Sequence, residues 1–196
     1  MADAGRVIAG TARGLRLQAP GGATRPLGDR VKQTLFAILE PELPGAAVLD
    51  LFAGSGAAGI EAASRGAAAV TFVDRDPTAI DTIRANLERT HLAGPTSRVV
   101  RAEAASWLAK PSPAGAPFDV VILDPPYAEP ALLARTLERL GEPGAALLGP
   151  VAIVVAKHFW RDRPPARIGL LASVDERRFG ETALTFYRRS DESERT

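Results

Sequence analysis

Four consecutive residues, Asp124-Pro125-Pro126-Tyr127, combine groups that suit the binding of a planar amine. The two prolines lack N–H donors, so the backbone there offers only carbonyl oxygens. The Asp124 carboxylate adds another acceptor, and Tyr127 adds a flat aromatic face. A planar ring can stack on that face while the two hydrogens of its NH2 group meet the two acceptors. The alternative is a plain proline turn after a strand, with Tyr127 as a packing residue.

An exocyclic amine needs such a setting before it reacts as a nucleophile, because its lone pair is delocalised into the ring. Hydrogen bonds to Asp124 and to the Pro125 carbonyl favour a pyramidal nitrogen with a localised pair. Stacking on Tyr127 would hold that pair in line with a methyl donor, an orientation effect that lowers the barrier. The tetrapeptide resembles the signature of methyltransferases that modify exocyclic amines of nucleobases. The catalytic candidates are therefore Asp124, Pro125, Pro126 and Tyr127.

A glycine-rich loop follows the first strand of the predicted main sheet and indicates an adenosine-containing cofactor. The loop has the G-x-G-x-x-G spacing from Gly54 onward, and Asp74 lies near the distance expected of a ribose-binding acid. The same loop serves NAD and S-adenosylmethionine. Asp50 favours S-adenosylmethionine, because a carboxylate beside the loop suits a ligand ammonium group better than a pyrophosphate. Asp124, in its Pro-Pro-Tyr context, has no use in hydride transfer and favours it as well.

Each cofactor candidate has an expected role. Asp50 would bind the amino group of S-adenosylmethionine directly or through water, while Gly54 and Gly56 let the backbone pass beneath the ligand. Asp74 would accept both ribose hydroxyls. Glu103 would read the adenine, although an acidic charge at a helix N-terminus is its alternative role. The cofactor-binding candidates are Asp50, Phe52, Ala53, Gly54, Ser55, Gly56, Asp74, Arg75, Glu103 and Ala104.

Alternating strands and helices must position these residues. Apolar, β-branched runs predict strands at 48–52, 69–73, 99–100, 119–123 and 152–155, with two more around 168–174 and 183–187. Helical spacing predicts helices at 29–39, 57–65 and 132–140, with Asp29 as the N-cap of the first. The alternation predicts an α/β fold with a doubly wound, parallel sheet. Its ligand site is expected at the carboxyl ends of the strands.

The amino-terminal part of the chain carries a concentration of basic residues. Residues 5–19 predict a short hairpin with Arg13 and Arg16 on the return strand, which must lean on the main domain or on RNA. Residues 1–33 hold six basic against two acidic side chains, a local excess of four positive charges. Such a face suits phosphate contacts, and a solvated basic surface is the alternative. The RNA-binding candidates are Arg6, Arg13, Arg16, Arg25, Arg30 and Lys32.

Composition narrows the class of protein. The 196 residues fit one domain with a small appendage, and the absence of cysteine excludes disulfides and cysteine-based metal sites. With only two histidines, no metal site is expected. The amino terminus shows no apolar signal segment, and no uncharged run is long enough to span a bilayer. We therefore expect a cytoplasmic protein with no membrane partner.

The chain closely resembles the bacterial ribosomal RNA small-subunit methyltransferases that methylate N2 of a guanine in 16S RNA, the small-subunit methyltransferase D (RsmD) family. The resemblance covers nearly the whole length. It rests on the arginine-rich hairpin (6–17), Thr24-Arg25-Pro26, Asp29-Arg30-Val31-Lys32, Asp50-Leu51-Phe52-Ala53-Gly54-Ser55-Gly56 and Asp124-Pro125-Pro126-Tyr127. Leu27-Gly28, Gln33 and Ala156-Lys157 depart from the family pattern, and the last pair stands where the family often has an acid. Residues 179–182 resemble the family's closing motif and are expected near the base pocket.

The resemblance implies a class I S-adenosylmethionine-dependent methyltransferase, with a Rossmann-like, mostly parallel seven-stranded sheet and an amino-terminal β-hairpin. The expected division is an RNA-engaging extension at 1–26, a methyltransferase domain at 27–190 and a tail at 191–196. The implied partner is 16S rRNA in the assembling 30S subunit, bound by a monomer. Two alternatives remain at this point, an adenine-N6 methyltransferase acting on DNA or RNA, and an RNA-binding assembly factor with a vestigial cofactor site.

Overall fold

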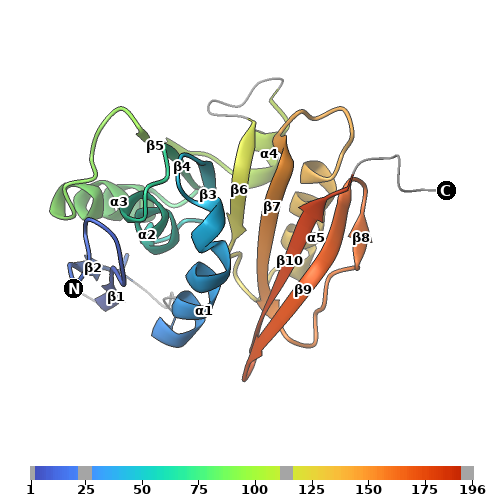
Figure 1. Ribbon diagram of the computed structural model, residues 1–196, viewed down its shortest axis with the longest axis horizontal. Coiled ribbons are helices and arrows are strands. Elements are labelled where there is room, and N and C mark those ends of the chain that lie inside the picture. Colours follow the sequence, from blue (N-terminus) through green and yellow to red (C-terminus); the bar gives the residue numbers. More distant parts are fainter. Residues whose placement is uncertain (1–2, 22–27, 111–116, 191–196) are drawn as a thin grey trace.

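The computed structural model describes residues 3–21, 28–110 and 117–190, and a twisted sheet runs through its centre (Figure 1). The sheet has eight strands in the order β5-β4-β3-β6-β7-β10-β9-β8. Their bounds in chain order are β3 (Ala47–Leu51), β4 (Ala69–Asp74), β5 (Ser97–Arg101), β6 (Phe118–Leu123), β7 (Leu148–Phe159), β8 (Arg167–Ile168), β9 (Leu171–Phe179) and β10 (Thr182–Arg189). Strands β5, β4, β3, β6 and β7 are parallel, while β10 runs antiparallel to both its neighbours. The predicted α/β class is therefore confirmed.

The sheet differs from the prediction in having eight strands instead of seven. The additional strand, β8, has only two residues and pairs with β9 at the edge of the sheet. The chain turns between them at Gly169, which has φ +55. Two residues are too few to show any period in the sequence, so the strand expected around 168–174 is divided by a tight turn at residues 169–170, with Ile168 in β8 and residues 171–174 in β9.

Helices cover both faces of the sheet and create two hydrophobic layers. On one face lie α1 (Asp29–Leu39), α2 (Ala57–Ser64) and α3 (Pro77–Arg89), and on the other lie α4 (Ala104–Leu108) and α5 (Pro130–Leu140). Neighbouring residues of β6 alternate between the layers, with Val120 and Ile122 in the first and Val121 and Leu123 in the second. Because β6 is packed from both sides, the segment that follows Leu123 starts from a fixed point. Among the described residues, no helix has the length and apolarity needed to cross a membrane.

The start of α1 differs from the prediction. Asp29 is its first helical residue, and Gly28 stands at the N-cap with no side-chain hydrogen bond. The acidic charge of Asp29 still lies in the first turn, where it interacts favourably with the helix dipole. A short 3-10 turn, η1 (Glu40–Glu42), follows α1.

The amino-terminal hairpin forms a separate two-stranded sheet from β1 (Asp3–Arg6) and β2 (Arg16–Gln18). Arg13 lies in the turn between the strands and not on the return strand, which corrects the prediction. The connecting loop docks on the carboxyl end of α2, where the Ala12 N–H donates to Ser64 Oγ at 2.9 Å. A Cβ added to Gly10 would meet the Ser64 carbonyl oxygen at 1.8 Å, so only glycine fits this close approach. The hairpin therefore packs against the main domain. The expected domain limit at residue 26 and the expected tail at 191–196 lie outside the described residues.

A buried asparagine joins the end of the hairpin to the glycine-rich loop. Asn86 of α3 is fully buried. Its side-chain amide bonds both backbone groups of Gln18, at 2.9 Å and 2.8 Å, and also donates to the Ser55 carbonyl at 2.9 Å. One side chain therefore fixes β2 and the loop after β3 relative to each other.

Candidate active site

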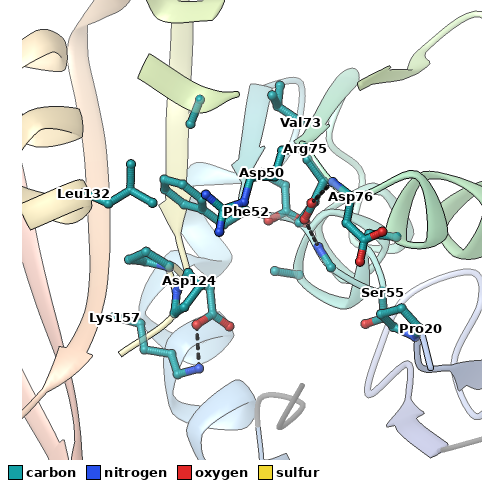
Figure 2. A pocket seen from close by; sticks show the side chains of 18 of the residues that line it. Pro20, Asp50, Phe52, Ser55, Val73, Arg75, Asp76, Asp124, Leu132 and Lys157 are labelled. Atoms are coloured by element: carbon teal, nitrogen blue, oxygen red, sulfur yellow. Dashed lines mark hydrogen bonds and ion pairs between the residues drawn. The ribbon is translucent and has the colours of Figure 1, made fainter. Parts of the chain in front are cut away.

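A cavity of about 560 Å³ opens at the carboxyl ends of the parallel strands, within the range of small-molecule sites (Figure 2). Its walls come from the segments that follow β3, β4, β5 and β6, and from the end of the hairpin at Ala19 and Pro20. All the catalytic candidates line it. Of the cofactor candidates, the ones that line it are Asp50, Phe52, Ala53, Gly54, Ser55, Asp74, Arg75, Glu103 and Ala104.

Gly56 is the exception among the cofactor candidates. It is the N-cap of α2, with φ +76, and it is buried under the turn and does not line the cavity. The loop reaches this turn through two further left-handed residues, Phe52 at φ +63 and Gly54 at φ +55. Gly59 serves packing, since a Cβ there would meet the Phe72 ring of β4 at 2.3 Å. Only the first of the three glycines therefore borders the ligand space.

Asp50 lies beneath the loop, at the end of β3. It is 2 % exposed, and its Oδ2 accepts the Gly59 N–H at 2.8 Å. Burial raises the pKa of Asp50 well above its ordinary value, and the negative charges of Asp124 and Asp74 raise it further. The carboxylate both anchors the first turns of α2 and borders the cavity, so a cationic ligand would relieve the cost of its charge.

Asp74 shapes the opposite wall. One of its carboxylate oxygens accepts the Gly54 N–H at 2.8 Å, and the other accepts the Asp76 N–H at 2.9 Å. Each carboxylate oxygen has a further lone pair, so Asp74 keeps acceptor capacity for ribose hydroxyls. The neighbouring Arg75 is directed to Glu129, with an N–O distance of 2.7 Å.

Glu103 performs its alternative role as well as lining the cavity. It is the N-cap of α4, and its two oxygens accept the N–H groups of Ala105 and Ser106 at 3.1 Å and 2.8 Å. Desolvation alone would raise the pKa of Glu103, but these hydrogen bonds bring it below its ordinary value. Its negative charge therefore lies at the cavity wall just after β5, beside Ala102 and Ala104.

Asp124 follows β6 directly and forms an ion pair with Lys157 of β7, with 2.5 Å between Nζ and Oδ1. The Asp124 N–H donates to the Leu51 carbonyl at 3.3 Å, which ties the start of the tetrapeptide to β3. Burial raises the pKa of Asp124 above its ordinary value, and the Lys157 charge lowers it part of the way back. Figure 2 shows this pair on the side of the cavity that faces Asp50. The side chain thus borders the proposed cofactor space, as the sequence argument requires.

Tyr127 stands at the edge of the cavity and is 37 % exposed. Its hydroxyl is 2.7 Å from the Thr182 Oγ1, so the predicted closing motif does lie beside it. Lys157 Nζ lies 5.1 Å from the centre of the Tyr127 ring. A second hollow of about 250 Å³ shares Pro125, Pro126, Tyr127 and Lys157 with the first. The tetrapeptide therefore forms the boundary between two adjoining spaces, which suits a donor on one side and an acceptor on the other.

The basic candidates of the amino-terminal segment separate into two groups. Arg6, Arg13, Arg16 and Arg30 are exposed, and Arg16 forms an exposed ion pair with Asp3. Lys32 is 1 % exposed, so the prediction that it contacts RNA is wrong. Its ammonium donates to the Arg6 carbonyl and lies 3.8 Å from Glu61, inside the joint between hairpin and helices. Arg25 lies outside the described residues.

Sequence reasoning noted Lys157 as a departure and did not place it in the site. The missing signal is the strand register: Leu123 of β6 pairs with Ala156 of β7, so the next residues, Asp124 and Lys157, emerge side by side. Ala19 and Pro20 were also missed, because their contribution depends on where the hairpin docks.

The cavity fits S-adenosylmethionine. Five carboxylates border it, while its two basic groups, Arg75 and Lys157, are both engaged in ion pairs. A ligand that carries positive charge at its sulfonium and ammonium groups complements that excess of negative charge. A solved structure titled "Putative methyltransferase yhhF from Escherichia coli" matches this one with a TM-score of 0.84 and 32 % identity, covering 96 % of this chain and 99 % of that one.

A more distant structure, titled "Crystal structure of SMU.776, a putative methyltransferase complexed with SAH", shares the fold at a TM-score of 0.65 and 17 % identity, over 80 % of this chain and 49 % of that one. Fold and site together define a class I S-adenosylmethionine-dependent methyltransferase. The chain belongs, more narrowly, to the family described as "Conserved hypothetical protein 95", which matches residues 5–188 and is the small-subunit methyltransferase D family.

Two relatives illustrate the family. A Bacillus subtilis (strain 168) protein named "Putative rRNA methyltransferase YlbH" is 37 % identical over 94 % of this chain and 98 % of its own length. The Escherichia coli (strain K12) "Ribosomal RNA small subunit methyltransferase D" is 41 % identical over 71 % of this chain and 68 % of its own length.

Proposed function

We propose that this protein methylates the exocyclic N2 amine of a guanine in a hairpin loop of 16S rRNA during small-subunit assembly. The carrying observation is that Asp124 lines the proposed cofactor cavity together with the partly exposed Tyr127. The names of the two relatives, both rRNA methyltransferases, support the choice of RNA, and the second supports the small subunit.

The residues that would hold the cofactor come from the carboxyl ends of three strands, β3, β4 and β5. Asp50 would face its ammonium group, Asp74 its ribose hydroxyls, and Glu103 and Ala104 its adenine, while Gly54 leaves room for the ligand beside the backbone. When bound, S-adenosylmethionine supplies a methyl group activated by a positive sulfonium.

The contribution of the protein to the reaction is mainly orientation. Asp124 and the Pro125 carbonyl accept the two amine hydrogens, and Tyr127 stacks on the base, which would be splayed out of its loop. One of the two hydrogens must leave as a proton once the nitrogen has acquired the methyl group. An oxygen of Asp124 takes that proton, a role that suits a carboxyl group whose pKa burial has raised.

The hairpin supplies the expected RNA surface. Arg6, Arg13 and Arg16 are exposed on it, and Arg30 is exposed on α1 nearby in the sequence. Guanidinium groups bind phosphate oxygens well, so this surface would position the RNA while the tetrapeptide reads the base. We propose that the protein acts as a monomer in the cytoplasm, where ribosomal particles assemble.

Tritium transfer from labelled S-adenosylmethionine tests the proposal, with 30S-derived particles, free 16S RNA and duplex DNA as acceptors. Nucleoside analysis of the labelled product should give N2-methylguanosine, from the particle or the RNA and not from the DNA. N6-methyladenosine would support the adenine alternative. Absence of both methyl transfer and cofactor binding by calorimetry would support the non-enzymatic assembly factor.

A further inference from the structure

The chain has only three lysines, and one of them, Lys157, lies where the substrate amine is expected. Its side chain is 13 % exposed and borders both the larger cavity and the adjoining hollow. It extends from the end of β7 toward Asp124, as Figure 2 shows. Nothing in the cofactor chemistry requires a cation here, because the donor brings its own positive charge.

The contacts of the Lys157 ammonium resemble those proposed for the base amine. It donates to Asp124 Oδ1 at 2.5 Å and lies 5.1 Å from the centre of the Tyr127 ring. Among the described residues, the second oxygen of Asp124 has no side-chain or backbone donor, so it remains available to a hydrogen of the amine. A carboxylate can accept from a lysine on one oxygen and from a substrate on the other.

We propose that Lys157 is a positioning residue for methyl transfer, one that holds the Asp124 carboxylate ionised and oriented while its other oxygen receives the substrate amine. The proposal rests on the methyl transfer proposed above. It assigns a role to a residue that departs from the acid often found at this position in the family pattern.

The charges around Asp124 explain why a cation is needed there. The groups that share its cavity are Asp50 from β3, Asp74 at the end of β4, Arg75 and Asp76 after it, Glu103 after β5, Tyr127, and Lys157 from β7. Most are acidic, and Arg75 is directed to Glu129 instead. Burial favours a protonated Asp124, which would donate a hydrogen to the amine instead of accepting one. Lys157 opposes that protonation at contact distance.

The pH dependence of methyl transfer tests the proposal. In Lys157→Met the acid limb of kcat/KM should move to higher pH, so that transfer at pH 6 falls about tenfold or more relative to the wild type and recovers toward pH 9. Lys157→Arg keeps the charge and should keep the wild-type profile. Lys110→Met removes an exposed lysine outside the site and serves as the matched control.

A second readout does not depend on activity. A carbon-13 NMR titration of the aspartate carboxyl groups, with Asp124 assigned from Asp124→Asn, should show Asp124 titrating at higher pH in Lys157→Met than in the wild type. Lys157→Gln serves the same measurement if circular dichroism shows that Lys157→Met does not fold. The same Asp124 titration and the same pH profile in the wild type and in the uncharged variant would overturn the inference. A wild type that methylates no RNA would instead reject the proposed function, and the titration would still decide the role of Lys157.

Discussion

Two lysine–carboxylate pairs, both largely withdrawn from solvent, occupy very different surroundings. In the joint beneath the hairpin, Glu61 of α2 is fully buried and accepts the N–H groups of Ile8 and Ala9, at 2.7 Å and 3.0 Å. It also accepts Arg65 Nε at 2.8 Å, with Lys32 Nζ at 3.8 Å. In the cavity, Asp124 has Lys157 as its side-chain partner among the described residues.

The difference lies in how many acceptor positions each carboxylate has left. Glu61 has donors on both oxygens, so its pair acts as a fixed joint between the hairpin, α1 and α2. In Asp124, one oxygen accepts a hydrogen bond from Lys157. The other oxygen remains an available acceptor at the cavity, so the carboxylate can still bind a ligand or substrate group. Burial of a charged pair is therefore not evidence of function by itself, whereas spare acceptor capacity on a carboxylate that lines a cavity points to a binding role.

The largest expected effect of a single substitution is on catalysis. Asp124→Ala removes the proposed acceptor and should lower methyl transfer by about a thousandfold or more, equivalent to about 4 kcal/mol. Cofactor affinity, measured by calorimetry, should change little. The free energy of unfolding, measured with urea, should fall by less than about 1 kcal/mol, because the Lys157 side chain can turn into the cavity and regain water. Wild-type turnover in this variant would remove Asp124 from the mechanism.

The corresponding change in the joint should act on stability. Glu61→Ala leaves Lys32 buried without its carboxylate and two backbone N–H groups without acceptors, at a cost of about 3 kcal/mol or more. Urea unfolding followed by circular dichroism measures that cost. Glu88→Ala, at an exposed position of α3, is the matched control and should change stability by less than about 0.5 kcal/mol. Equal losses in the two variants would contradict the role of the joint.

The smallest expected effect is on RNA affinity, whose salt dependence should distinguish an exposed basic residue from a buried one. Arg16 is exposed, so Arg16→Ala should lower the slope of log affinity against log salt by about 1 if it neutralises one phosphate. Lys32→Met should leave that slope unchanged, since Lys32 is enclosed in the joint. Arg135→Ala, exposed on α5, is a control for the loss of one surface charge. A lowered slope in Lys32→Met would mean that Lys32 does contact RNA.

The burial of Lys32 could have been predicted from the sequence, and the role of Lys157 could not. Lys32, Leu35, Phe36 and Leu39 have the i, i+3, i+4, i+7 spacing of one helix face, so the lysine belongs to the apolar stripe. Basic residues nearby in the sequence make the charge of Lys32 the more conspicuous feature, although the helical spacing predicts its burial. Lys157 instead follows an apolar strand, and its contact with Asp124 depends on the register between β6 and β7.

The same distinction holds for the fold and the site as a whole. Runs of apolar residues predicted the parallel strands, and the carboxyl ends of those strands placed Asp50, Asp74 and Asp124 around one space, as observed. Hydrogen bonds between distant segments were beyond such reasoning, because they depend on docking geometry. The pairing of Tyr127 with Thr182 and the contact of Asn86 with Gln18 are of this kind.

The end of the hairpin has a structural consequence besides the proposed presentation of arginines to RNA. Ala19 and Pro20 are part of the wall around the methyl donor's expected place, and Asn86 ties the preceding residue to Ser55 on that same wall. The hairpin is therefore not an independent appendage. A chain that lacks residues 1–20 would also lose Ala19 and Pro20 from the wall of the cavity. A displacement of the hairpin end would therefore also affect the glycine-rich loop, because the Asn86 amide bonds both Gln18 and Ser55.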